Sequence, residues 1–261
     1  MIRRFLSDSH KYFLYAVNAA KAQLKAEVAN SYLNWIWWIL EPVCFTFIYY
    51  TVFGVFFNLK EQYMISFIMV AVSLWDFFNR MMKNSVNIMR TNKSIVSRIY
   101  LPKYVLIYVR IGVNGFKMLI TLLIAAATMI VLKVPVSWHV FLAIPILLVF
   151  MMFCFGLGCI LLHFGVYVDD LNHVVEIVLR MIFYLTGIFY NVEKRIPAPL
   201  GGILAKVNPI AYCINALRNV LLYRTVPDLS MLLIWFDVSL LLCIFGVYTV
   251  YKNENSYVKS I

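Results

Sequence analysis

The sequence predicts an all-α integral membrane protein with six transmembrane helices, an amphipathic N-terminal helix and short re-entrant helices before the last span. Three observations lead to this fold class. Of the 261 residues, 63% are hydrophobic and only 13% are charged, whereas a soluble domain carries about 25% charged residues. The apolar residues gather in runs of the length that a helix needs to cross a bilayer. The basic residues flank these runs, which is typical of membrane proteins and excludes a nucleic-acid partner.

The N-terminal segment, residues 1–33, is predicted to form an amphipathic helix on the cytoplasmic side. Its apolar residues Phe13, Ala20 and Leu24 recur at helical spacing, and Lys21 lies beside them. A helix of this kind lies in the headgroup plane of a membrane or packs on the cytoplasmic face of the protein.

Residues 34–251 are predicted to form one transmembrane domain. The first apolar run opens with tryptophans, whose rings favour the membrane–water boundary. Glu41 must face protein, water or the interface, because a carboxylate is costly in lipid, and Pro42 can bend the helix. The six expected spans cover residues 35–57, 63–82, the run from Pro102 to 132, 139–163, 174–190 and 231–250.

Several charged residues lie inside these runs and require partners. Asp76 and Arg80 are four residues apart and are predicted to pair on one helix face, as are Glu176 and Arg180. Lys117 lies deep in the third run, so it requires a polar partner or a water-filled cavity.

Two connections are unusually long. Residues 83–103 are too charged to span, and the apolar residues among the basic ones predict one or two short amphipathic helices there. Residues 191–230 hold two apolar pieces that are too short to span, which indicates re-entrant or interfacial helices. Lysine and arginine concentrate in the leader, in the 83–103 loop and in the tail 252–261, so both termini are expected in the cytoplasm.

The sequence contains no phosphate-binding loop of the form Gly-x-x-x-x-Gly-Lys-Ser/Thr, so a separate chain must bind any ATP that the protein uses. The best candidate for acid–base or metal chemistry is the group His163, Asp169, Asp170, His173 and Glu176. Asp170, His173 and Glu176 are spaced three apart and can share one helix face. Acidic residues before a helix usually cap it, however, so we expect no catalytic residue, metal or cofactor in this chain.

Aromatic residues are frequent on the first and fifth runs. They pack in the core and at the membrane boundary, or some of them line a conduit in which sugar rings stack on aromatic faces, and the sequence does not divide the two sets. The residues predicted to line a conduit are Trp37, Trp38, Tyr49, Tyr50, Phe183, Tyr184 and Tyr190.

Several segments together resemble the ABC-2 type export permeases, in the branch that moves polysaccharides and teichoic acids. Trp35–Pro42, followed by Phe53–Phe56, resembles the signature of the family's first span. The other matching segments follow in the family's order and are Val96–Pro102, Val168–Leu171, Asn208–Tyr212 and Ala216–Arg218.

This resemblance implies a homodimer of six-span subunits in the bacterial cytoplasmic membrane. Two ATPase subunits, which hold ATP and Mg²⁺, would drive export of a lipid-linked glycan such as O-antigen, capsule or teichoic acid. The residues implied in coupling to the ATPase are Asn92, Ser94, Arg98, Tyr100, Pro102, Asp169 and Asp170. Those implied in gating or in support of the gate are Glu41, Pro42, Asn208, Pro209 and Arg218.

Three alternatives remain open at this point. An ABC-2 exporter of a small molecule or drug would need no aromatic conduit wide enough for sugar. A membrane-embedded enzyme would use the Asp169–Glu176 group. A channel would operate without an ATPase.

Overall fold

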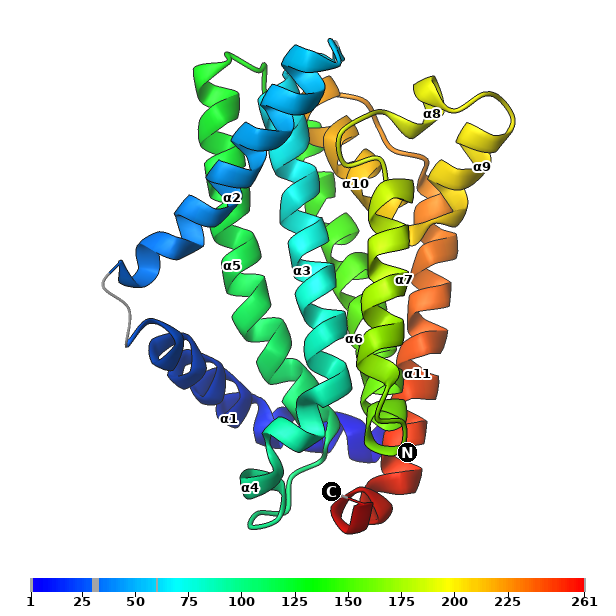
Figure 1. Ribbon diagram of the computed structural model, residues 1–261. Coiled ribbons are helices and arrows are strands. Elements are labelled where there is room, and N and C mark those ends of the chain that lie inside the picture. Colours follow the sequence, from blue (N-terminus) through cyan, green and yellow to red (C-terminus); the bar gives the residue numbers. More distant parts are fainter. Residues whose placement is uncertain (1, 30–32, 60, 261) are drawn as a thin grey trace.

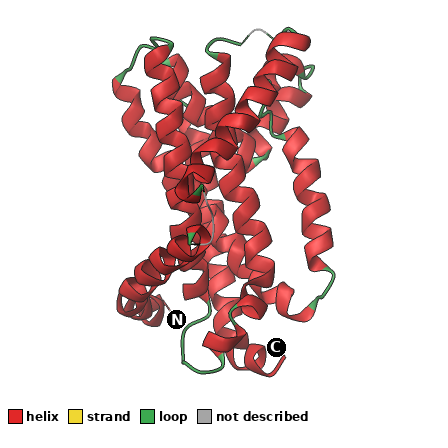
Figure 2. Ribbon diagram, turned by 60° about the vertical axis from the view of Figure 1, so that its left-hand side comes forward, coloured by secondary structure: helices red, strands yellow, loops and turns green. Residues whose placement is uncertain are grey.

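The computed structural model describes residues 2–29, 33–59 and 61–260, and all regular structure within them is helical (Figure 1; Figure 2). Among these residues, five helices are long and apolar enough to cross a membrane. They are α2 (Trp37–Tyr49) with its π-helical continuation Tyr50–Phe56, α3 (Met64–Thr91), α5 (Tyr104–Val131), α6 (Ala143–Tyr167) with the preceding 3₁₀ turn Trp138–Leu142, and α11 (Leu229–Ser260).

The other helices are shorter or lie outside the bundle. They are α1 (Ile2–Val28), the turn Asn34–Ile36, α4 (Lys93–Val96), α7 (Leu171–Leu185), α8 (Val192–Arg195), α9 (Leu200–Val207), α10 (Pro209–Arg218) and the π-helical turn Asn219–Tyr223. Both chain ends lie at the same end of the bundle, which we call the terminal end (Figure 1; Figure 2).

Helix α3 lies at the centre of the bundle and packs against α2, α5, α6, α7 and α10. Its first half is apolar on all sides, and Phe67, Ile68 and Leu74 are fully buried. Glycine allows α6 to approach α3 closely, because a Cβ atom at Gly165 would collide with the backbone of Val86. Close approach through small residues is typical of membrane helix pairs.

Most of the predicted leader, Ile2–Val28, forms the helix α1, which lies across the terminal end of the bundle and packs on α5 (Figure 1). The face that it buries is centred on Ala16 and Ala20. Phe13, which the sequence placed on the same stripe, is 64% exposed in the single chain. The leader therefore packs through its small residues and leaves larger apolar side chains toward its surroundings.

The fifth predicted span is the one that differs in length. It forms α7, which has 15 residues and is shorter than the other helices that cross the bundle. α7 packs against α3 and α6 and leads from the terminal end toward the opposite end (Figure 1). The segment after it contains the sixth candidate for crossing, a pair formed by α9 and Pro209–Tyr223 that is bent by 94°. This bent pair matches the predicted re-entrant helices.

Two polar segments are more helical than expected. α3 continues to Thr91 instead of ending near Met82, so only the short α4 and the turns around it form a separate coupling element. α11 continues through the predicted tail to Ser260. No glycine or proline interrupts either extension, and Val86 and Tyr257 are buried there, so tertiary packing maintains the helices. Residues 30–32 of the leader and Lys60 of the first predicted turn lie outside the described residues.

Candidate functional site

The residues predicted to couple to an ATPase lie together at the terminal end. Asn92 joins α3 to α4, and its side-chain amide donates to the Ile88 carbonyl at 2.8 Å. Ser94 and Arg98 are exposed, whereas Pro102 is buried against the bundle. Buried Lys103 donates from Nζ to the Leu101 carbonyl at 3.0 Å, and burial lowers the pKa of this lysine. The segment is therefore anchored at its start and end, and between them most side chains are exposed while Val96 is buried.

Tyr100 connects this segment to both ends of the chain. Its hydroxyl accepts a hydrogen bond from Arg4 Nη2 at 2.6 Å and donates to Glu254 Oε2 at 3.3 Å. In the same network, the Tyr251 hydroxyl donates to Asp8 Oδ2 at 2.9 Å. Arg4, Asp8, Tyr251 and Glu254 were not singled out from the sequence, because local patterns do not identify partners so distant along the chain.

The second predicted coupling segment meets the first. Asp169, in the α6–α7 loop, forms an ion pair with Arg90, two residues before Asn92. Asp170 begins α7 and is exposed, but its side chain makes no capping hydrogen bond. The two segments thus present one continuous surface at the terminal end.

Two members of the Asp169–Glu176 group form ion pairs with arginine. Asp169 is engaged by Arg90, and Glu176 forms the predicted ion pair with Arg180 at 2.9 Å, which is confirmed. His163 shares a hydrogen bond with the Tyr257 hydroxyl at 2.8 Å. Across the described ranges, no group of three or more His, Cys, Asp and Glu residues has a metal-binding arrangement.

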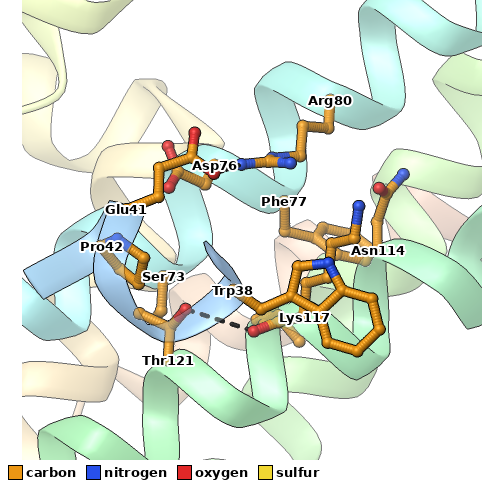
Figure 3. A pocket seen from close by; sticks show the side chains of 11 residues that line it. Trp38, Glu41, Pro42, Ser73, Asp76, Phe77, Arg80, Asn114, Lys117 and Thr121 are labelled. Carbon is orange, nitrogen blue, oxygen red and sulfur yellow. Dashed lines mark hydrogen bonds and ion pairs between the residues drawn. The ribbon is translucent and has the colours of Figure 1, made fainter. Parts of the chain in front are cut away.

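A polar pocket lies between α2, α3 and α5 (Figure 3). Arg80 pairs with Glu41 of α2, their Nη2 and Oε2 atoms 2.7 Å apart, and this corrects the predicted pair between Asp76 and Arg80. Asp76 lines the same pocket. Lys117 also lines it and pairs with Glu27 of α1 at 2.5 Å, which supplies the polar partner that the sequence required. The remaining lining residues are Trp38, Pro42, Ser73, Phe77, Asn114, Met118 and Thr121.

The predicted conduit residues divide into two groups along α2. Trp37 is exposed near the start of the helix, and Trp38 packs edge-on against Phe116 at 5.7 Å. Tyr49 lies about three helical turns further along the helix, and its ring centroid is 6.4 Å from that of Phe183 of α7. The sequence grouped these residues by type, and the structure separates them along the helix.

The second group extends into an aromatic cluster formed by Tyr49, Phe53, Trp75, Phe183 and Phe189. The rings of Phe53 and Phe189 stack at 4.3 Å, and Trp75 of α3 packs against Phe183 at 5.2 Å. Trp75 was not expected from the sequence, because it looks like any other core residue of a buried span.

Tyr184 contacts this cluster through Phe183, their ring centroids 5.3 Å apart. Tyr184 is exposed, and its carbonyl accepts a hydrogen bond from the Tyr190 hydroxyl at 2.7 Å. Tyr50 begins the π-helical turn on α2 and packs against Gly54. The cluster thus lies between α2, α3 and α7, and its members Trp75 and Phe189 are buried in the bundle.

Two of the predicted gate residues, Asn208 and Pro209, form the start of α10 in the bent helix pair, whereas Glu41 and Pro42 line the polar pocket. Asn208 caps α10 by accepting from the backbone N–H groups of Ile210 and Ala211, and Pro209 occupies the first turn of α10. The Asn208 side-chain amide also donates to Thr186 Oγ1 at 3.3 Å, which ties α10 to the end of α7.

Arg218 at the end of α10 is 1% exposed, and backbone carbonyls surround it. Its guanidinium donates to the carbonyls of Phe67, Gly187 and Ile188 at 3.1, 2.9 and 2.8 Å. It also lies 3.3 Å from the centre of the Phe67 ring. One side chain therefore joins α10, the start of α3 and the turn after α7.

The bundle has the architecture of a transporter subunit. It combines the bent α9–α10 pair, the exposed helix α4 and the ion pairs Glu41–Arg80 and Glu27–Lys117. Residues 18–222 match the ABC-2 type transporter family, and the chain belongs to that family.

Among known proteins, it is similar to the O-antigen export system permease protein RfbA of Myxococcus xanthus, with 21% identity over 243 residues and 92% of each chain covered. Two O-antigen export system permease proteins named RfbA from Klebsiella pneumoniae are 24% and 25% identical to it. The first alignment covers 77% of this chain and 78% of the relative, and the second covers 75% of each.

Proposed function

We propose that this chain is the transmembrane subunit of an ATP-driven exporter that moves a lipid-linked polysaccharide across the bacterial cytoplasmic membrane. Two copies of the chain form the conduit, and two copies of a separate ATPase subunit bind ATP with Mg²⁺. Family membership supports the transporter class. The similarity to three O-antigen export permeases supports a polysaccharide as the cargo.

The observation that carries the proposal is the aromatic cluster between α2 and α7, together with the exposed surface of α2. Only 11% of the membrane-spanning part of α2 is buried in the single chain, compared with 78% for α3. A membrane helix left so exposed is available to a second copy of the chain or to cargo. The aromatic rings of α2 have apolar faces, and its tyrosines add hydroxyl groups. Both suit a sugar, which exposes C–H groups and hydroxyls.

The terminal end supplies the surface for an ATPase. The chain has no nucleotide-binding loop, so it needs a partner that has one. α4 projects from the bundle beside the Arg90–Asp169 ion pair, where a partner can reach it (Figure 1). Closure of the ATPases would press on α4, and Tyr100 would carry that displacement to α1 and α11 through Arg4 and Glu254.

The orientation follows from charge. The basic residues of the leader and of the α3–α4 junction lie at the terminal end, which the positive-inside rule assigns to the cytoplasm. The bent α9–α10 pair then faces outward. Arg218 and Asn208 would hold this pair in place while cargo passes beside it.

The experiment that tests the proposal is purification of this chain from its native host in a mild detergent, with mass spectrometry of the bound proteins. We expect a stoichiometric subunit that carries a nucleotide-binding loop. If repeated preparations of the folded chain lack such a subunit, the proposal of an ATP-driven exporter is overturned. Depletion of the chain should also reduce surface glycan and leave its lipid-linked precursor inside the cell.

The alternatives predict different results in the same cells. A drug exporter would leave surface glycan unchanged on depletion of the chain. Transport that persists after ATP depletion would indicate a channel. Loss of product formation in Asp170→Asn, with the ATPase complex intact, would indicate a membrane enzyme.

A further inference from the structure

An apolar crevice of about 310 Å³ opens at the end of the bundle opposite the termini. Its walls come from α5, α6, the turn between them and the segment that ends α10, and include Ala126, Met129, Val136, Leu147, Leu217 and Leu221. The volume is in the range of protein pockets that bind small ligands, and every wall residue is apolar.

The crevice opens to the surroundings of the bundle. Ile130 and Val136, which line it, are 76% and 71% exposed. Where these walls face lipid, water does not fill an apolar space, and an empty one would forfeit the dispersion contacts of its lining. A hydrocarbon chain is the occupant that matches both the lining and the surroundings.

Two basic residues lie beside the crevice, in the same turns as its walls. Lys133 directly precedes the lining residue Val134. Arg224 directly follows the π-helical turn that contains Leu221, and its Nε atom donates to the Pro135 carbonyl at 2.9 Å. Within the described ranges, neither basic group forms an ion pair with a carboxylate. Lys194 and Lys206, in the 191–230 segment, form ion pairs with Glu61 and Asp228 at 3.2 and 3.4 Å.

Aromatic side chains mark the same level of the protein. Trp138 and Phe141 lie in the short 3₁₀ helix Trp138–Leu142, which begins two residues after the lining residue Val136, and both side chains are largely exposed. Tryptophan is enriched at the boundary between hydrocarbon and lipid headgroups, and lysine and arginine side chains near the ends of spans extend toward the same boundary. The crevice thus extends from this boundary into the hydrocarbon region.

We propose that the crevice binds one acyl chain of an anionic phospholipid from the adjacent leaflet, with the lipid phosphate held by Lys133 and Arg224. The acyl chain contacts Leu217 and Leu221, so the bound lipid supports the segment that follows the bent helix pair. This lipid is a resident of the site and is distinct from any transported cargo.

The test measures lipid retention by the purified full-length chain. The chain is delipidated in detergent, mixed with equal amounts of phosphatidylglycerol and phosphatidylcholine, and analysed by native mass spectrometry. We expect one retained phosphatidylglycerol per chain, with a preference over phosphatidylcholine of at least tenfold, because each basic residue near an anionic headgroup contributes about a fivefold factor.

Two sets of variants separate the acyl site from the phosphate site. Ala126→Trp fills the crevice and should reduce retention of both lipids about tenfold, while Ala127→Trp, one residue away and outside the lining, should not. The double variant Lys133→Gln/Arg224→Gln should retain lipid but lose the preference for phosphatidylglycerol. Its matched control is Lys194→Gln/Lys206→Gln, which removes two paired lysines and should keep the preference.

Three results would overturn the inference. Equal retention by the Ala126 and Ala127 variants would mean that the bound lipid lies elsewhere. Equal retention of the two lipids by the unmodified chain would exclude a phosphate site. A change in the number of associated chains in Ala126→Trp would assign the crevice to an interface between copies. The charge variants lie on the surface, so they remain informative if Ala126→Trp fails to fold.

Discussion

Lys117, halfway along α5, forms an ion pair with Glu27 near the end of the leader helix, their Nζ and Oε2 atoms 2.5 Å apart. The lysine side chain is 16% exposed and the glutamate 34%. This contact joins an amphipathic helix at the terminal end to the middle of a membrane span. The ion pair neutralises Lys117 at a depth where an unpaired charge would cost free energy.

Removal of one partner of this pair should destabilise the protein more than removal of both. Glu27→Gln leaves the ammonium of Lys117 in a poorly solvated position, and we expect a loss of about 2–4 kcal/mol of unfolding free energy. The double variant Glu27→Gln/Lys117→Met should lose less than Glu27→Gln alone, and therefore clearly less than the sum of the single changes. Thermal unfolding in detergent measures this cycle, and additive losses would show that the two side chains do not interact.

The same pair illustrates what the sequence could predict. The need of Lys117 for a partner followed from its depth in an apolar run, which is a local property. The identity of Glu27 did not follow, because it depends on how α1 crosses the bundle. Arg80 shows the limit more sharply: helical spacing favoured Asp76, and the tertiary contact with Glu41 replaced it.

Fold elements defined by composition were predicted well, and those defined by packing were not. Five of the six spans followed from apolar length, whereas α7 is shorter than predicted. The bent pair fits the two apolar pieces of residues 191–230, each of which is too short to span. The end of α3 was placed too early because charged residues suggested a loop, whereas buried Val86 and Met89 extend the helix. Within the candidate site, the role of Trp75 depended on which helix faces it.

Arg218 should not tolerate replacement, even by lysine. Its planar guanidinium reaches three backbone carbonyls in different directions, which a single ammonium cannot reproduce. We expect Arg218→Lys to lower the unfolding free energy by about 2 kcal/mol and Arg218→Ala by about 3 kcal/mol or more. Chemical denaturation in detergent tests this order, and a lysine variant as stable as the parent would contradict the geometric role.

Gly165 should be intolerant of alanine, because a Cβ atom there would meet the Val86 backbone and separate α6 from α3. Gly202, also helical, has open space around it. We therefore expect Gly165→Ala to destabilise the protein by about 1–3 kcal/mol and Gly202→Ala to be neutral or stabilising by up to about 1 kcal/mol. Parallel melting curves provide the comparison, and similar shifts in both variants would refute the close packing.

Asn208 and Asn191 provide a matched test of the cap on the bent pair. Each accepts hydrogen bonds from two backbone N–H groups, at 3.0 and 3.3 Å for Asn208 and at 3.0 and 3.4 Å for Asn191. Asn208 begins the buried α10, whereas Asn191 begins the short α8. We expect Asn208→Ala to lose about 1–2 kcal/mol and Asn191→Ala less than about 0.5 kcal/mol. Equal losses, measured by thermal unfolding, would show that the cap of α10 has no special importance.

Arg90 and Asp169 allow coupling to be separated from stability. Their side chains are 40% and 86% exposed, and an ion pair so exposed contributes less than about 1 kcal/mol to folding. Arg90→Glu should therefore leave the melting temperature nearly unchanged. If this surface conveys motion from the ATPase, the same variant should reduce glycan export at least fivefold while the assembled complex still hydrolyses ATP.

The double variant Arg90→Asp/Asp169→Arg restores the pair and should recover part of the export. Recovery would assign the effect to the joint between the two coupling segments, because a direct contact of Arg90 with the partner would not be restored by exchanging the charges. Unchanged export in Arg90→Glu would remove this surface from the coupling path.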